Sequence, residues 1–514
     1  MSLVFALERT NQLSLLPDKD LVDLCPPIEP YQVTKNRLSE VLEDNDKIRI
    51  DSEYFKLEYL SKLRHIKELT YRKIEEFAYV TDGIHESIQF DENSSINLIS
   101  AKSPKDNIFD LSGNEYISQT QHIKNPRTAL QKDDVIISTV GTIGNCAVVD
   151  ETILPANSDR HVGIVRIEKD FKPYFLSTFI LSKYGRFQTL RESTGNVQLN
   201  LFIYKIKTLK IPFLSNYFQL IIQNIVKFAH ELLIESQAIY QQAEDLLLKE
   251  LGLKDWNPTE ESIAVKSFSE SFLSSGRLDA EYYQPKFYQV ENKIKANGFV
   301  LVEDICSLVN YGSVPTSPYT ETDEGVPYIK GLNLKNTEII TTQLDRIINT
   351  ENLPSKVYTK KGDIVISQMG TVGNCGVVED EQFGWIFASF TIRIRIKDQS
   401  KFNPYFVALY IEKVAKEYYL MRNIAQASVR QNTDLPTIKN MYIPLISKDT
   451  QLSIAEKMLS AKKTKQKSKQ LLEIAKIGVE KAIETDEETA TAWINQQLES
   501  LDISPLFKGG RGDQ

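Results

Sequence analysis

One phrase of the sequence occurs twice and constrains the fold more than any other feature. Residues 132–146 read KDDVIISTVGTIGNC and residues 361–375 read KGDIVISQMGTVGNC, an offset of 375 − 146 = 229 positions. In each copy a run of β-branched residues leads into a turn that contains two glycines, and a second apolar run follows. This pattern predicts a β-hairpin. A repeat of this length is a whole domain rather than a solenoid unit, so we expect one domain that is used twice.

Further matches between the copies set the extent of the two domains. RIDSEYF begins at Arg49 and RLDAEYY begins at Arg277, and each is followed by a short charged segment that favours a helix. The pairs Lys172-Pro173 and Asn403-Pro404 each predict a helix start, because proline suits the first turn. We therefore predict an α+β fold with two repeated domains of mixed helices and strands, at residues 49–215 and 277–447.

A long heptad-patterned segment follows each domain, at residues 216–251 and 448–484. At ~1.5 Å per residue each would be a helix of ~54 Å. Apolar positions alternate in steps of four and three, as in a coiled-coil seam. Every seventh residue along the seam is small, which lets two backbones approach closely. The helix–helix interface is therefore predicted at Ala229, Ser236, Ala243, Ala461, Ser468 and Ala475. We expect the two helices to pack as an antiparallel coiled coil; the alternative is that each packs separately on its own domain.

Three segments lie outside the repeat. Residues 1–48 form an N-terminal extension without a counterpart, residues 252–276 form a polar linker, and residues 485–514 are predicted to be a flexible tail. No apolar run reaches the ~18 residues of a membrane span. The four cysteines form no CxxC pair, so we expect a reducing, cytoplasmic location, with Cys146 and Cys375 as small buried residues of the hairpin.

The sequence lacks the motifs of several enzyme classes. It contains neither a GxxxxGK[ST] phosphate loop nor a GxGxxG dinucleotide motif, and no Cys or His cluster indicates a metal site. None of the five histidines has a histidine at the equivalent place in the other copy. Because a duplicated catalytic domain would keep its acid–base residues in both copies, we expect a binding module without catalytic residues. The net charge of −8 does not exclude DNA binding, which depends on the local surface.

Loops that differ between the copies are the predicted ligand contacts. Arg, Asn and Gln side chains read base edges, whereas Lys mostly contacts phosphate. The candidate DNA-binding residues of the first copy are Lys102, Lys105, Lys124, Arg127, Asn157, Arg160, His161, Arg191, Asn196 and Gln198. Those of the second copy are Lys330, Asn333, Lys335, Asn336, Lys360, Arg393, Arg422, Gln426, Arg430 and Gln431.

The order domain, long helix, domain, long helix resembles the DNA-specificity (S) subunits of type I restriction–modification enzymes. The resemblance rests on the duplicated K-x-D-[IV]-[IV]-I-S-x-x-G-T-[IV]-G phrase, on R-[IL]-D-x-E-Y-[FY] and on GVPYIK at residues 325–330, and it covers about residues 49–484. It implies that each repeat is a target-recognition domain for one half of a split double-stranded DNA sequence, and that the helices form the spacer between them.

The same resemblance implies the partners and cofactors of the chain. Two methyltransferase (M) subunits would dock on the helices, and restriction/translocase (R) subunits would join them. The S subunit would bind no cofactor directly, whereas its partners would use S-adenosylmethionine, ATP and Mg²⁺. Two alternatives remain open from the residues alone: a duplicated scaffold that recognises protein and does not read DNA, and a nuclease, for which no motif is present.

Overall fold

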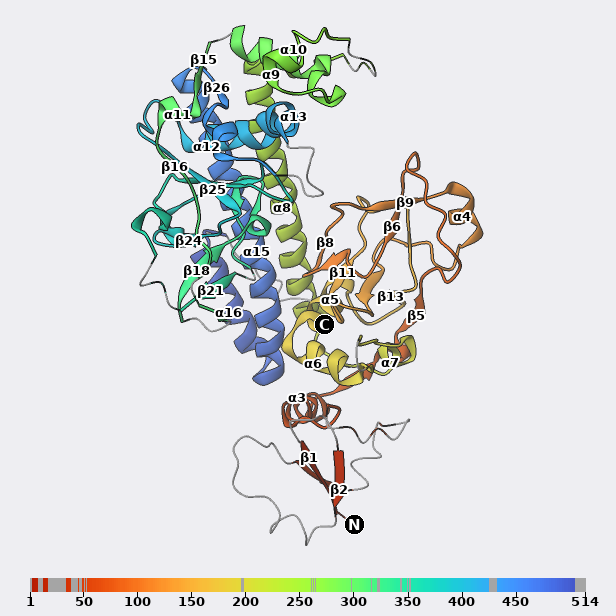
Figure 1. The fold of residues 1–514 in the computed structure, drawn as a ribbon. Helices are drawn as coiled ribbons and strands as arrows, with labels where there is room; N and C mark the ends of the chain where they lie inside the picture. Colours follow the sequence, from red (N-terminus) through yellow and green to blue (C-terminus); the bar gives the residue numbers. More distant parts are fainter. Residues whose placement is uncertain are drawn as a thin grey trace. The chain divides into compact units, whose positions relative to one another are not determined.

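The computed structural model describes most of the chain. It covers residues 53–503 apart from 196–197, 260, 262, 264, 297, 316, 321–323, 343, 349, 351–352 and 425–431, together with residues 45, 49 and 51 and three N-terminal strands. The described part falls into two compact units, residues 1–233 with 465–514 (unit 1) and residues 234–464 (unit 2). Two long helices, α8 (Asn216–Glu250) and α15 (Lys448–Glu484), contribute one half to each unit (Figure 1).

Unit 1 contains the first repeat. Its elements are β1 (Ser2–Leu7), β2 (Leu13–Leu16), β3 (Thr34–Arg37), α3 (Leu57–Glu68), β4 (Tyr71–Lys73), η1 (Ile74–Glu76), β5 (Ala78–Asp82), β6 (Ile96–Ile99), β7 (Pro104–Lys105), β8 (Ile108–Phe109), β9 (Glu115–Ile117), α4 (Gln119–Lys124), β10 (Val135–Ser138), β11 (Cys146–Val148), β12 (Ala156–Ser158), β13 (Val162–Ile167), α5 (Pro173–Leu181), α6 (Lys183–Glu192), α7 (Ile203–Lys207), β14 (Lys210–Pro212) and α16 (Glu487–Ser500).

Unit 2 contains the second repeat. Its elements are α9 (Phe272–Ser275), η2 (Ala280–Tyr283), α10 (Pro285–Ala296), β15 (Phe299–Leu301), α11 (Val302–Ile305), β16 (Cys306–Tyr311), β17 (Tyr319–Thr320), β18 (Val326–Ile329), η3 (Gly331–Asn333), β19 (Leu334–Lys335), β20 (Glu338–Ile339), β21 (Asp345–Ile347), η4 (Ser355–Val357), β22 (Ile364–Ser367), β23 (Cys375–Val377), η5 (Asp380–Gln382), β24 (Ile386–Phe387), β25 (Thr391–Ile396), α12 (Pro404–Tyr410), the π-helix η6 (Ile411–Leu420), α13 (Met421–Asn423), α14 (Leu435–Lys439) and β26 (Tyr442–Pro444).

The two repeats share one strand order. The central sheet is β11-β10-β13-β5 in unit 1 and β23-β22-β25-β16 in unit 2. In both, a second sheet pairs a late strand in parallel with an early one, β12 with β6 and β24 with β18. The duplicated phrase is the predicted antiparallel hairpin, β10–β11 in unit 1 and β22–β23 in unit 2. The repeat of sequence is therefore a repeat of fold.

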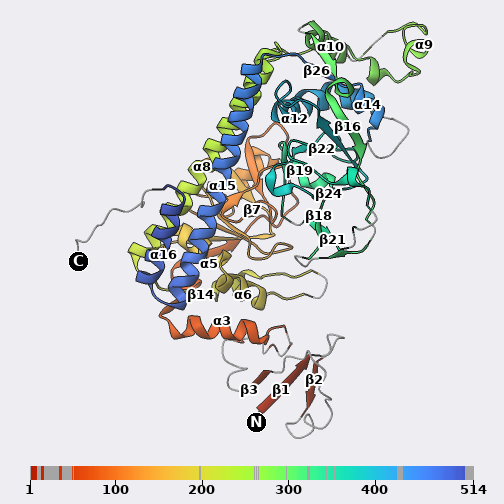
Figure 2. The ribbon, with the colours of Figure 1, turned by 90° about the vertical axis from the view of Figure 1, so that its left-hand side faces the viewer.

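The long helices pack against each other in both units. In unit 1 the Ser468 hydroxyl donates to the Ala229 carbonyl oxygen (2.6 Å), and in unit 2 the Ser236 hydroxyl donates to the Ala461 carbonyl oxygen (2.7 Å). These four small residues are buried, as are Ala243 and Ala475. Figure 2 shows α8 and α15 side by side in each unit. Residue 468 thus meets residue 229, whereas the earlier residue 461 meets the later residue 236, so the helices run antiparallel as predicted. The small side chains let each seryl hydroxyl reach the opposite backbone.

The prediction of a flexible tail at 485–514 is wrong for its first half. Residues 487–500 form α16, which begins where the Asp486 side chain accepts the Thr489 N–H (2.8 Å). Its buried face, Ala490, Ile494 and Leu498, joins the unit 1 core with α15. The spacing of four residues is that of an apolar helix face. Residues 504–514 lie outside the described part of the chain, as does most of the N-terminal extension.

Candidate nucleic-acid interface

Three loops of unit 1 meet at the turn of the β10–β11 hairpin. The Ser138 and Thr142 hydroxyls donate to the carbonyl oxygen of Ala101, at 2.9 and 3.1 Å. The Thr139 N–H donates to the His161 carbonyl oxygen (3.0 Å), and Val140 forms a bridge with Asn200. We call turn 139–144, with loops 84–85, 100–102 and 159–161 and with residues 194–195 and 198–200, the hairpin end of unit 1. Gly141 and Gly144 have positive φ, +73° and +76°, which turns the chain there.

Unit 2 builds the same structure from its own loops. The Gln368 N–H donates to the Phe390 carbonyl oxygen (3.0 Å), and Met369 forms a bridge with Asn432. A Cβ on Gly331 would lie 2.7 Å from the Ser367 hydroxyl, so loop 330–332 also runs against the turn. We call turn 368–373, with loops 313–314, 330–332, 388–390 and 432–433, the hairpin end of unit 2. Variable loops on a shared scaffold are where binding residues concentrate.

The polar residues of the duplicated phrase serve the scaffold. Asp134 accepts two hydrogen bonds from Arg166 at 2.8 Å, and Asp363 accepts two from Arg395 at 2.6 and 2.7 Å. Each aspartate also accepts a backbone N–H from the turn before its strand, at 2.8 Å. The phrase is therefore repeated because it fixes the hairpin against the neighbouring strand. Its two cysteines, Cys146 and Cys375, are buried, and burial raises the pKa of both thiols well above the ordinary value.

Arg191 and Arg422, both predicted to contact DNA, are equivalent structural clamps instead. The Arg191 Nε donates to the Tyr54 carbonyl oxygen (3.1 Å), and its guanidinium lies 3.6 Å from the centre of that ring. The Arg422 Nε donates to the Tyr282 carbonyl oxygen (3.1 Å) and lies 4.5 Å from the corresponding ring centre. Each guanidinium also pairs with a carboxylate, at 3.0 and 2.8 Å. Their donors are thus directed at protein.

Burial removes three more residues from the predicted set. The Asn157 amide donates to the Thr128 hydroxyl (2.9 Å) inside unit 1. The Asn333 side chain accepts the Lys330 N–H (2.9 Å), which closes a turn. Arg393 is fully buried and donates to Asp363 at 2.8 Å. All three side chains are buried, so none of them is presented to a ligand in solvent.

Four predicted cations are engaged in ion pairs. Lys124 binds Glu86 at 2.7 Å, and hydrogen bonds from Lys124 and Asn125 lower the pKa of Glu86 to about 2. Arg127 binds Asp82 at 2.9 Å. Burial raises the pKa of Asp82, but hydrogen bonds from His85 and Arg127 outweigh it and keep the pKa below the ordinary value. Lys105 lies 3.9 Å from Asp110, and Lys330 pairs with Asp345.

The remaining predicted residues divide by position. Lys102, Arg160, His161 and Gln198 come together on the loops of the unit 1 hairpin end, where His161 is half-buried and the other three are exposed. Lys335 and Asn336 are exposed on the β19–β20 hairpin, and Lys360 is exposed before the start of β22. Asn196, Gln426, Arg430 and Gln431 lie outside the described residues.

Sequence reasoning missed three apolar residues at the hairpin end of unit 2. Val314, Leu332 and Phe390 are large apolar side chains exposed to solvent on its loops. A list of basic and amide side chains cannot contain them. The signal that could have found them is the alignment of the two copies, because Phe390 stands 390 − 161 = 229 positions after His161, which is the offset of the duplicated phrase.

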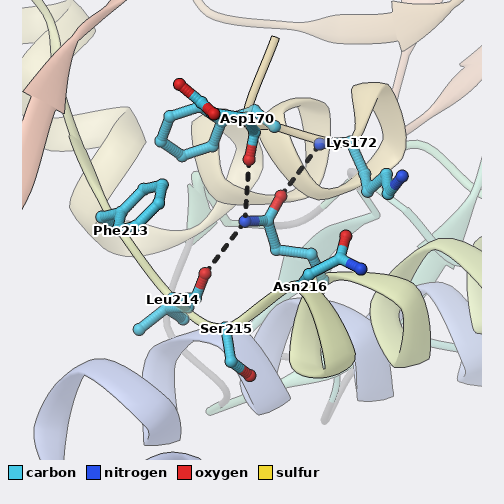
Figure 3. Close-up of a pocket in the computed structure, with 8 residues that line it drawn as sticks. Asp170, Lys172, Phe213, Leu214, Ser215 and Asn216 are labelled. Atoms are coloured by element: carbon cyan, nitrogen blue, oxygen red, sulfur yellow. Dashed lines mark hydrogen bonds between the residues drawn. The ribbon is translucent and has the colours of Figure 1, made fainter. Parts of the chain in front are cut away.

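A surface pocket in unit 1 lies where α5 and α8 begin, and not at the hairpin end. It has a volume of about 490 Å³ and is lined by Asp170, Phe171, Lys172, Phe213, Leu214, Ser215, Asn216 and Gln219. The buried Gln219 amide accepts the Lys172 N–H (2.9 Å) and donates to the Leu214 carbonyl oxygen (3.0 Å), as Figure 3 shows. In unit 2 Gln451 accepts the Asn403 N–H (2.9 Å) in the same way. The pocket is thus part of the anchor between the repeat and its long helix.

Within the described residues, no group of three or more His, Cys, Asp or Glu side chains is placed to hold a metal ion. The helices of that same part include none with the length and apolar character needed to cross a membrane.

Comparison with known proteins gives a family for the second repeat. The model of the type I restriction modification DNA specificity domain matches residues 297–475. A search of curated proteins gives no match. Among solved structures, the type I restriction–modification S subunit from M. genitalium is 14% identical, with a TM-score of 0.40, over 84% of this chain and 95% of that one. The HsdS subunit from Thermoanaerobacter tengcongensis is 13% identical, with a TM-score of 0.27, over 81% and 97%.

The family match covers the second repeat, and the structure relates the first repeat to it. Both repeats have the same central strand order, the same hairpin and the same arginine clamp. The model that matches the second repeat is that of a DNA specificity domain. Residues 297–475 thus match the type I restriction modification DNA specificity domain, and the first repeat is their internal counterpart in fold.

Proposed function

We propose that the chain reads a bipartite target in double-stranded DNA, with one half-site for each hairpin end. The observation that carries this proposal is the pair of hairpin ends, in which equivalent backbones present different side chains. A scaffold that is kept while its exposed loops diverge is suited to two different readings. Two modest half-site affinities joined in one chain multiply into a selective interaction.

The cationic side chains at the unit 1 hairpin end support a DNA partner. Lys102 and Arg160 are exposed there, so both are available to phosphate or to base edges. We further propose that the chain directs two methyltransferase subunits and the restriction/translocase subunits to this target in the cytoplasm. Those partners would bring S-adenosylmethionine, ATP and Mg²⁺.

Selection from random duplex DNA tests whether the chain recognises a bipartite target. The full chain, immobilised, is offered a library of random duplexes at low salt, and the retained pool is sequenced. We expect two specified blocks separated by an unspecified gap of fixed length, and an affinity that falls steeply as salt rises. The variant Arg160→Ala should change the preference in one block only. A single continuous block, or changes in both blocks, would contradict the assignment of one half-site to each unit.

Partner binding is tested on the same chain. Native mass spectrometry of the chain with the methyltransferase subunit should give a complex with two copies of that subunit, and adenine methylation of the selected duplex should require S-adenosylmethionine. Retention of no duplex at any salt concentration, together with capture of protein partners, would instead favour a scaffold that recognises protein.

A further inference from the structure

The hairpin ends of the two units carry different side chains at three equivalent positions. His161 and Phe390 are equivalent, because the carbonyl oxygen of each accepts the first backbone N–H of its hairpin turn at 3.0 Å. The residues two positions earlier are equivalent as well. The Asp159 N–H donates to the carbonyl oxygen of Ile99 at the end of β6, and the Ala388 N–H donates to that of Ile329 at the end of β18. His161 is a polar, half-buried residue, whereas Phe390 is an aromatic residue with 59% of its surface exposed.

The other two positions also have a polar residue in unit 1 and an exposed apolar residue in unit 2. Loop 100–102 leads into β7 and loop 330–332 leads into β19, which makes Leu332 the counterpart of Lys102. The residues before His85 and Val314 form equivalent parallel bridges, Ile84 with Asp159 and Ser313 with Ala388. Val314 is therefore the counterpart of His85. Leu332 and Val314 are each 66% exposed.

This difference is not the ordinary scatter of apolar residues over a surface. A single exposed apolar side chain needs no explanation, whereas several on one face mark an interaction site. All three belong to loops that meet at turn 368–373, and the Ser389 N–H donates to the Ser313 carbonyl oxygen (3.0 Å), which joins two of these loops. In unit 1 the same places hold two histidines and a lysine.

Duplex DNA offers one apolar group to a reader in its major groove, the 5-methyl group of thymine. We propose that unit 2 recognises its half-site through thymine methyl groups, which Phe390, Leu332 and Val314 contact, whereas unit 1 recognises its half-site through hydrogen bonds and charge. This inference rests on the proposed function and specifies the chemistry of one half-site.

The test replaces thymine with deoxyuridine, which keeps every hydrogen-bonding group of the base and removes only the methyl. The probe is the duplex that the full chain selects from the random library, prepared with deoxyuridine in one block at a time. We expect affinity to fall about fourfold for each methyl removed from the unit 2 block, the effect of losing one buried group of that size. Deoxyuridine in the unit 1 block should leave the affinity unchanged.

A pair of phenylalanine variants provides the matched control. Phe390→Ala should weaken binding about tenfold and reduce the difference between thymine and deoxyuridine in the unit 2 block, where Leu332 and Val314 still contact methyl groups. Phe383→Ala removes another exposed ring of unit 2 and should change neither quantity. Phe383 lies away from the hairpin end, beside Gly384, whose N–H donates to the Thr359 carbonyl oxygen. Circular dichroism of both variants confirms that they are folded.

Each outcome decides the inference. Equal binding of the thymine and deoxyuridine duplexes overturns it, as does a Phe390→Ala loss that is the same on both duplexes, because the ring would then act as a wedge rather than as a methyl reader. Failure to select any duplex would count against the proposed function itself, and so differs from failure of the methyl reading.

Discussion

The hairpin ends of the two units share their backbone arrangement and differ in the side chains at three equivalent positions. In unit 1 the three compared positions hold His85, Lys102 and the half-buried His161, with Arg160 exposed beside them, and these are polar or basic; Leu199 is the large apolar side chain that is exposed on the same loops. In unit 2 the counterparts of His85, Lys102 and His161 are apolar and exposed. Because the hydrogen bonds that join the loops to the turn are repeated, the difference lies in side chains that the fold does not need. Divergence of this kind indicates a difference in what each unit binds.

The interior shows the reverse behaviour. The arginine clamps, the hairpin aspartates and the seryl hydroxyls of the long helices are repeated with nearly the same distances in both units. A polar residue that is equivalent in both copies is therefore a structural residue in this chain, whereas a polar residue that changes between copies is a candidate reader. The predictions below test this distinction, from the largest expected effect to the smallest.

Removal of the hairpin aspartate should lower the free energy of unfolding more in unit 2 than in unit 1. Asp363 pairs with Arg393, which is fully buried, and with Arg395, so Asp363→Ala leaves a buried charge unpaired and should cost about 3–5 kcal/mol. Asp134→Ala leaves only Arg166, whose side chain is 26% exposed, and should cost about 1–3 kcal/mol. Urea unfolding followed by tryptophan fluorescence measures both, because Trp493 lies in unit 1 and Trp256 and Trp385 lie in unit 2. Equal losses would contradict the role given to Arg393.

A larger residue in the seam between α8 and α15 should lower stability by a similar amount in the two units. Ala475→Leu in unit 1 and Ala243→Leu in unit 2 each add volume at a fully buried position, and each should cost about 1–3 kcal/mol. Ile234→Leu on the exposed face of α8 is the control and should stay within about 0.5 kcal/mol. Urea unfolding measures all three, and unchanged stability of both seam variants would mean that the helices do not pack closely.

The arginine clamps distinguish structural from reading arginines. Arg191→Lys and Arg422→Lys keep the charge but lose the stacking and the directed hydrogen bond, so each should cost about 1–2 kcal/mol of stability. Neither should alter the salt dependence of DNA binding. Arg160→Ala should do the opposite, with stability kept and the salt slope reduced by about one. A reduced slope for Arg191→Lys would return that residue to the DNA-binding set.

The features of this chain that depend on local sequence could be predicted, whereas those that depend on contacts between distant residues could not. The repeat, the hairpins and the coiled coil were predictable because their signals are local and periodic. The burial of Arg191 was not, since it depends on Tyr54, which is 137 positions away in the sequence. Helix α16 was predictable from the spacing of its apolar residues. Exposed Phe390 resembled a core residue, because sequence alone does not show which apolar side chains remain outside.

The smallest expected effect is a pH dependence at the start of the second repeat. Arg277 donates two hydrogen bonds to Asp279, at 2.8 and 2.7 Å, and these outweigh burial and keep the pKa of Asp279 below its ordinary value. A carboxylate with a lowered pKa stabilises the fold above its unfolded-state pKa of about 3.9, and this contribution is lost as the pH falls through the folded value. Asp279→Asn should therefore cost about 1 kcal/mol at pH 7 in urea unfolding, and this difference should vanish once the pH has fallen through the lowered pKa of folded Asp279. The equivalent Asp51→Asn should cost less at pH 7, because 43% of the Asp51 side chain is exposed to water. An equal loss for both, or a difference that persists in acid, would mean that Arg277 and Asp279 act by packing rather than by charge.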